Sequence, residues 1–219
     1  MIKAIIFDMD GVISDTDKTR FKLLKIILEK RGLILEDRYY KKSVGKRTKM
    51  FLAEMFPDDL SDDEIDKIYY ERISEFHKNP EKYIIAQPFV KECCELLIKE
   101  GFVLTIASVS RKKDIILVLN KIGIQNFFTY IISSDNITHM KPDPEIYLKA
   151  IDKLGMQNNE CIAIEDSPNG VRSAKSAGIK CIGLTYTHSS KELINSDYII
   201  ANLKEINKEF IREINSKTQ

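Results

Sequence analysis

The chain has 219 residues, of which 43% are hydrophobic and 31% are charged, a balance typical of a folded globular protein and not of a disordered chain. The formal net charge is only +1, so bulk charge gives no reason to expect nucleic-acid or membrane binding. No apolar run approaches the roughly 20 residues that a membrane span needs.

The first predicted element is a buried strand at residues 2–7, with the sequence IKAIIF. Residues 16–80 then lack a strand pattern. They contain an apolar helical stripe at Phe21, Leu24, Ile27 and Leu28 and further helical stretches at 47–56 and 62–77. We therefore expect a helical insert, residues 16–81, within a core domain formed by residues 1–15 and 82–219.

Strands and helices alternate from about residue 83 to the end of the chain. The predicted strands are 102–108, 130–134, 161–165, 180–185 and 198–200, and the predicted helices are 88–100, 111–122, 144–154 and 168–177. This alternation predicts right-handed βαβ units, and hence an α/β fold with a Rossmann-like parallel sheet and helices on both faces. The polar stretch REINSKTQ, residues 212–219, is expected to fray.

The cysteines indicate the compartment. They stand at positions 93, 94, 161 and 181, in apolar segments and without a C-x-x-C or zinc-like spacing. We expect them to be free core residues and the protein to occupy a reducing cytoplasm. The N-terminal apolar stretch is short and runs into two aspartates, which is unlike a signal peptide.

Polar side chains follow four of the predicted strands. They are Asp8 and Asp10 after the first, Ser108 and Ser110 after the second, Lys141 beyond the third, and Glu165 and Asp166 after the fourth. Because the carboxyl ends of parallel strands meet at one edge, we expect one site. Carboxylates there favour Mg²⁺, whereas a lysine and a serine suit a phosphate group. No histidine or cysteine lies among them, so the remaining nucleophile is a carboxylate.

Four stretches carry a resemblance to a known family: DMDGVISD (8–15), IASVS (106–110), MKPDPEIYLKA (140–150) and EDSPNGVRSAKSAGIKCIGLT (165–185). In their residues, order and spacing these stretches resemble the motifs of the haloacid dehalogenase (HAD) superfamily, in its β-phosphoglucomutase-like phosphatase branch. The resemblance implies a core domain with a helical cap. It also implies a monomeric, Mg²⁺-dependent phosphatase that acts on a small phosphorylated metabolite, a sugar or polyol phosphate.

The resemblance also implies roles for individual residues. Asp8 matches the nucleophile that forms an aspartyl-phosphate, and Asp10 matches the general acid and base. The Mg²⁺ ligands match the Asp8 carboxylate, the Asp10 backbone carbonyl and the Asp166 carboxylate. Ser108 matches the hydroxyl that binds the transferring phosphoryl group, and Lys141 matches the lysine that neutralises it and orients the nucleophile.

Some of these residues also have a structural interpretation. Asp166 or Ser167 can cap the helix that follows them, and Ser110 fits the cap of the helix after it better than Ser108 does. Glu165 either binds the metal through water or is purely structural. Histidines without ligand spacing, which we interpret as surface residues, are His77, His139 and His188.

Basic residues of the insert bear on the choice of substrate. Gly45, Lys46 and Arg47 either place positive charge near a second phosphate or a sugar, or form a solvated basic face, and Arg20 is a further candidate in the cap. Sugar-phosphate mutases of this branch carry a histidine near position 20 and an arginine three residues after the cap glycine, here Gly45, where this chain has Arg20 and Thr48. A shift by one residue would place Arg47 there. A phosphatase is favoured; a mutase and a non-catalytic phospho-accepting regulatory domain are the alternatives.

Overall fold

The computed structural model describes residues 1–44 and 46–216. Gly45, on which the mutase comparison is aligned, lies outside these ranges, as do the last three residues of the stretch expected to fray. The chain divides into two compact units. One consists of Met1–Ser14 together with the residues from Ala86 onward, and the other of Asp15–Ile85.

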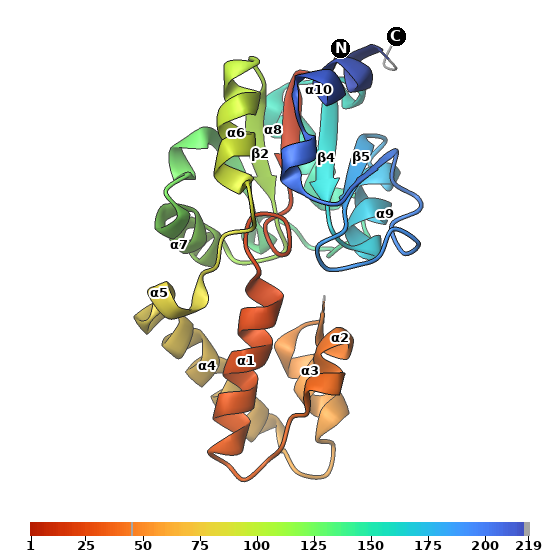
Figure 1. Ribbon diagram of the computed structural model, residues 1–219. Coiled ribbons are helices and arrows are strands. Elements are labelled where there is room, and N and C mark those ends of the chain that lie inside the picture. Colours follow the sequence, from red (N-terminus) through yellow and green to blue (C-terminus); the bar gives the residue numbers. More distant parts are fainter. Residues whose placement is uncertain (45, 217–219) are drawn as a thin grey trace. The chain divides into compact units, whose positions relative to one another are not determined.

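A six-stranded parallel sheet forms the centre of the first unit (Figure 1). Its strand order is β3-β2-β1-β4-β5-β6, and the strands are β1 (Ala4–Phe7), β2 (Val103–Ala107), β3 (Phe128–Ile132), β4 (Cys161–Glu165), β5 (Lys180–Leu184) and β6 (Tyr198–Ile200). Every neighbouring pair is parallel. The predicted α/β class is therefore confirmed.

Helices cover both faces of this sheet. They are α6 (Val90–Lys99), α7 (Lys112–Ile122), α8 (Glu145–Leu154), α9 (Pro168–Ser176) and α10 (Lys208–Ser216). Figure 1 shows α6 and α10 in front of the strands and α8 behind them. On one face, a buried cluster joins α8 and α9 to alternate residues of β1 and β4 and to Cys181 of β5.

Most predicted strand and helix boundaries lie within one or two residues of the observed ones, and two predictions need correction. The third strand begins at Phe128 and ends at Ile132, two residues earlier than expected, because the Ser133 amide and hydroxyl donate to the Asn136 side chain and start a 3-10 turn. The C-terminal stretch was expected to fray, which is wrong for its described part. Residues up to Ser216 belong to α10, whose Ile211 and Ile214 are buried.

The strand order reverses between β1 and β4. From β1 the chain adds β2 and then β3 on one side, and it then crosses back to add β4, β5 and β6 on the other side. Phe7 pairs with Ile164, and the backbone N–H of Asp8 donates to the Ile164 carbonyl at 3.0 Å. This register sets Asp8 beside the last residue of β4, Glu165. Ligands of open parallel sheets bind at this kind of switch point, beyond the carboxyl ends of the strands.

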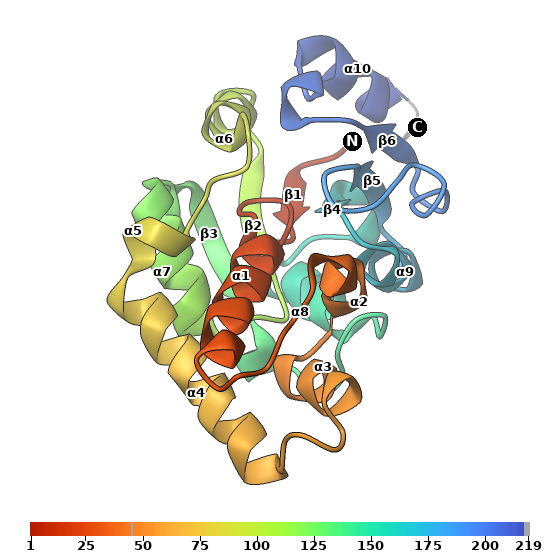
Figure 2. The same ribbon diagram turned by 60° about the horizontal axis from the view of Figure 1, so that its bottom comes forward.

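In the second unit, the described residues form helices joined by loops, and no strand. The unit contains α1 (Thr16–Glu29), α2 (Tyr40–Ser43), α3 (Thr48–Met55), α4 (Asp62–Lys78) and α5 (Pro80–Tyr83). Helix α1 packs against α4 and α2, and α3 packs against α4 (Figure 2). The stripe predicted on α1 is buried in their shared core. Within residues 1–44 and 46–216, no helix combines the length and apolar character needed to cross a membrane.

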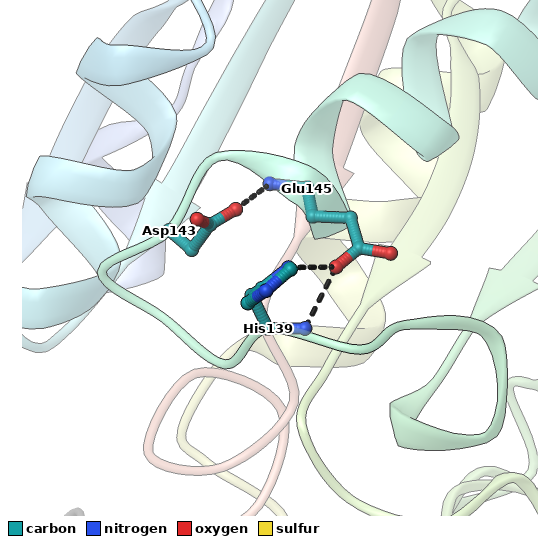
Figure 3. Close-up of side chains that lie close together, drawn as sticks. All are labelled: His139, Asp143 and Glu145. Carbon is teal, nitrogen blue, oxygen red and sulfur yellow. Dashed lines mark hydrogen bonds and ion pairs between the residues drawn. The ribbon is translucent and has the colours of Figure 1, made fainter.

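Glu145, the first residue of α8, holds the loop that precedes this helix (Figure 3). Its carboxylate accepts the backbone N–H groups of Thr138 and His139, the latter at 2.7 Å, and contacts the His139 ring. Asp143 in turn accepts the Glu145 backbone N–H at 2.9 Å. The bond from the His139 backbone is the largest cause that lowers the pKa of Glu145 to about 2. The loop is thus fixed by an ionised carboxylate.

We predict that Glu145→Gln lowers the unfolding temperature at neutral pH, because the amide accepts through one oxygen only. Because the pKa of Glu145 is lower in the folded protein than its usual value of 4.5, the ionised carboxylate stabilises the folded state at any pH above 4.5. This stabilisation is lost as the pH falls towards about 2. The difference from wild type should therefore shrink between pH 4.5 and pH 2. Thermal melts across this range test it, with the exposed mid-helix Glu95→Gln as control. A pH-independent difference would contradict the prediction.

Candidate active site

Asp8 and Asp10 leave β1 through a tight turn that brings the chain close to β4. Asp8 is buried, and Gly11 has a φ of +85°, a conformation that favours glycine. A Cβ at Gly11 would lie only 1.9 Å from Asp166 Oδ2. The glycine therefore lets the turn after β1 approach the carboxylate that follows β4.

Lys141 lies at the centre of the site, and its side chain is only 8% exposed. Its ammonium group donates to Asp8 Oδ1 at 2.7 Å, to the Ala107 carbonyl at 2.9 Å and to Glu165 Oε1 at 2.6 Å. An ammonium group has three N–H donors, and three protein acceptors meet them here. The group that was predicted beyond the third strand thus joins the ends of β1, β2 and β4.

Glu165 is completely buried and has a second donor. The hydroxyl of Tyr147, on α8, donates to the same Oε1 atom at 2.5 Å. On the other side, a Cβ at Gly170 would lie 1.9 Å from Glu165 Oε2. Ser167 caps α9 by accepting the Gly170 N–H. Of the two candidates for this cap, Asp166 and Ser167, it is therefore Ser167 that caps the helix.

Asp10 is held by the hydroxyl groups that follow β2. Ser110 donates to Asp10 Oδ2 at 2.7 Å, and Ser108 donates to the same oxygen at 3.2 Å. The expectation that Ser110 caps the next helix is wrong. Arg111 is the N-cap residue of α7, and the N–H of Lys112, the first residue of α7, donates to Asp135 Oδ2 at 3.0 Å. The Ser110 hydroxyl is bonded to Asp10 instead.

Three buried carboxylates could hold a metal ion. Asp8, Glu165 and Asp166 each offer an oxygen, and these atoms lie within 4.8 Å of one another. Lys141 contacts two of the three, and hard oxygen donors of this kind suit Mg²⁺. The residues therefore fit the ion.

A second group within metal-binding reach is far less suited to a cation. It consists of His139, Asp143 and Glu145 (Figure 3). His139 is exposed, and both carboxylates already accept backbone N–H groups of their own loop. This group fixes the loop that carries Lys141.

Burial and charge act against each other at the centre of the site. Burial raises the pKa of the Asp8 carboxyl well above its usual value, and the Lys141 ammonium opposes this only in part. Burial also acts to lower the pKa of Lys141, but the Asp8 and Glu165 carboxylates outweigh it and raise the pKa above its usual value. The lysine is therefore charged, and further positive charge would favour ionised Asp8.

Sequence reasoning missed two residues of this site. His188 was interpreted as a surface residue, but it is half-buried, and its Nδ1 lies 3.0 Å from the Asp166 carbonyl. A lone histidine in a loop gives no signal of this contact. Tyr147 lies inside the stretch MKPDPEIYLKA, where the sequence pattern indicates only an apolar position of a helix.

The basic residues predicted to face a substrate lie in the helical unit. The Arg20 guanidinium forms an ion pair with Asp17 and donates to the Ser43 carbonyl at 3.3 Å. Arg47 is exposed and precedes α3. Arg20 thus has a buried carboxylate partner within its own unit, whereas Arg47 fits the interpretation of a solvated charge.

Comparisons with known proteins agree with this architecture. The family described as "Haloacid dehalogenase-like hydrolase" matches residues 5–184. The Bacillus subtilis (strain 168) protein named "Putative phosphatase YhcW" is 35% identical over 186 residues, covering 83% of each chain. The phosphorylated carbohydrates phosphatase of Thermotoga maritima is 27% identical, covering 83% of this chain and 84% of its own.

A solved structure shows the same fold. The β-phosphoglucomutase of Clostridium difficile has a TM-score of 0.83 at 23% identity, covering 99% of this chain and 98% of its own. The predicted family is confirmed by the match over most of the chain and by the 35% identical relative. The chain belongs to the haloacid dehalogenase-like hydrolase family and is a HAD-like phosphatase.

Proposed function

We propose that this phosphatase is Mg²⁺-dependent and hydrolyses a small phosphomonoester, a sugar or polyol phosphate, through an aspartyl-phosphate on Asp8. The observation that carries the proposal is the buried ion pair between Lys141 and Asp8 Oδ1, at 2.7 Å, beside two further buried carboxylates. A carboxylate can attack a phosphate dianion only if positive charge offsets their repulsion.

The metal would be held by the carboxylates of Asp8 and Asp166 and, as in the family, by the Asp10 backbone carbonyl. Bound there, Mg²⁺ supplies the positive charge that neutralises the phosphoryl oxygens. Glu165 Oε1 already accepts hydrogen bonds from Lys141 and Tyr147. This favours contact between Glu165 and the metal through a water molecule.

In the first step, an oxygen of the Asp8 carboxylate attacks phosphorus, and the bond between phosphorus and the leaving oxygen breaks. Asp10 gives its proton to that oxygen, so that a neutral alcohol leaves. The hydroxyl groups of Ser108 and Ser110, both bonded to Asp10 Oδ2, support this role because they orient the acid. We also assign to Ser108 the role of the matching family hydroxyl, which binds the transferring phosphoryl group.

In the second step, water attacks the aspartyl-phosphate. The Asp10 carboxylate takes a proton from the water, the new bond to phosphorus forms, and the bond to the Asp8 oxygen breaks. Inorganic phosphate leaves, and both aspartates return to their starting states. Lys141 keeps its charge throughout and orients Asp8.

The names of relatives support the substrate class. One is a phosphatase of phosphorylated carbohydrates, and another, from Streptomyces hygroscopicus subsp. limoneus, is a validoxylamine A 7'-phosphate phosphatase at 26% identity over 94% of this chain. We further propose that the helical unit is the cap domain. A mutase would share the first step, but Arg20 stands where such mutases carry histidine.

A substrate panel distinguishes a phosphatase from a mutase. The purified protein with Mg²⁺ is incubated with sugar phosphates, polyol phosphates and nucleotides, with and without a sugar bisphosphate, and products are followed by phosphate assay and ³¹P NMR. We expect inorganic phosphate from sugar or polyol monoesters and no phosphorylated isomer. Bisphosphate-dependent isomer formation with little phosphate release would contradict a phosphatase.

We predict that Asp8→Asn lowers kcat by about 10³-fold or more, because the amide cannot attack phosphorus. The exposed Asp152→Asn, on α8, makes the same chemical change outside the site and should keep full activity. Phosphate release measures the rates, and circular dichroism melts verify folding. A folded Asp8→Asn enzyme with near wild-type turnover would exclude the covalent route.

We also predict that Asp166→Asn raises the Mg²⁺ concentration for half-maximal activity by about tenfold or more, because one charged ligand is lost. Asp143→Asn alters the second carboxylate group and should leave this concentration unchanged. Chelation of the metal should abolish phosphate release in wild type. An unaltered Mg²⁺ titration for Asp166→Asn, or a shifted one for Asp143→Asn, would count against the assignment.

A further inference from the structure

Tyr147 is a buried tyrosine whose hydroxyl faces the catalytic centre. It is the third residue of α8, is 0% exposed, and donates to Glu165 Oε1 at 2.5 Å. Its ring also lies beside the lysine, with Lys141 Nζ 5.1 Å from the ring centroid. One side chain thus contacts both the carboxylate and the ammonium group that face Asp8.

The three acceptors of Lys141 differ in how firmly they are placed. The Ala107 carbonyl is a backbone atom at the end of β2, so the sheet fixes it. Asp8 Oδ1 belongs to the reacting carboxylate. The third acceptor, Glu165 Oε1, is a side-chain atom, and its position depends on what holds that carboxylate.

Besides Lys141, three residues contact the Glu165 carboxylate: Tyr147, Ser167 and Gly170. Oε2 packs against Gly170, where a Cβ would come within 1.9 Å, and accepts only a long bond of 3.4 Å from Ser167 among the described hydrogen bonds. Tyr147 provides the shorter bond, to Oε1. Without the hydroxyl, a completely buried charged group would lose a donor, which costs more than the bond itself contributes.

We propose that Tyr147 is a positioning residue for phosphoryl transfer: through Glu165 Oε1 it holds the Lys141 ammonium on the Asp8 carboxylate. This inference rests on the proposed function, because it assigns Lys141 the task of orienting the nucleophile. The hydroxyl acts on the geometry of the attack and not on substrate binding, so kcat should respond more than KM.

Tyr147→Phe tests the proposal because it removes the hydroxyl and keeps the buried ring. We expect kcat to fall about 10- to 100-fold, the range for residues that orient a functional group, with KM changed by less than about threefold. The control is Tyr83→Phe, which removes a hydroxyl bonded to Glu75 at 3.0 Å in the helical unit. This control should keep the wild-type kcat.

Two further measurements separate positioning from a loss of stability. In ¹⁵N-lysine-labelled, substrate-free protein, the Lys141 ammonium signal, assigned by its absence in Lys141→Met, should broaden or shift in Tyr147→Phe and not in Tyr83→Phe. In a double-mutant cycle with Glu165→Gln, the two changes should be non-additive in kcat, because one acts through the other.

The results distinguish this inference from the proposed function. If Lys141→Met keeps wild-type kcat, the proposed function fails. If Lys141→Met loses activity but Tyr147→Phe stays within twofold of wild-type kcat, only the role of Tyr147 is overturned. An unchanged Lys141 signal in Tyr147→Phe, or additive effects with Glu165→Gln, would overturn it equally.

Discussion

The carboxylates of Asp8, Glu165 and Asp166 are buried together at the ends of β1 and β4, and the Lys141 ammonium lies between the first two. Charges of one sign resist both burial and each other, so these groups stay ionised together only with compensating positive charge. Lys141 supplies part of it, and the donor set suits a divalent cation for the rest. The same positive charge is what a carboxylate needs when it approaches a phosphate group.

The fold places these groups through features that have little chemistry of their own. The parallel order sets β1 next to β4, and Gly11 and Gly170 remove side chains that would displace Asp166 and Glu165. Glu145 fixes the loop that carries Lys141 by accepting its backbone N–H groups. The reactive residues are therefore held by a rigid scaffold of strand ends and a pinned loop.

The sequence was sufficient to predict the parallel sheet and the residues at its carboxyl edge, because apolar periodicity and strand-end positions are local signals. Contacts made across the fold were not predictable in this way. Ser110 looked like a helix cap, yet its hydroxyl reaches Asp10, 100 residues away in sequence. His188 had no ligand spacing, and α10 was hidden because its buried isoleucines, Ile211 and Ile214, are few among polar neighbours.

Diffraction from a crystal soaked in Mn²⁺, a hard divalent cation with an anomalous signal, tests the central claim most directly. The account predicts one anomalous peak between the carboxylates of Asp8 and Asp166, with Lys141 still on Asp8. A peak at His139, Asp143 and Glu145 instead, or a cation bound with Asp8 turned away from it, would contradict the account.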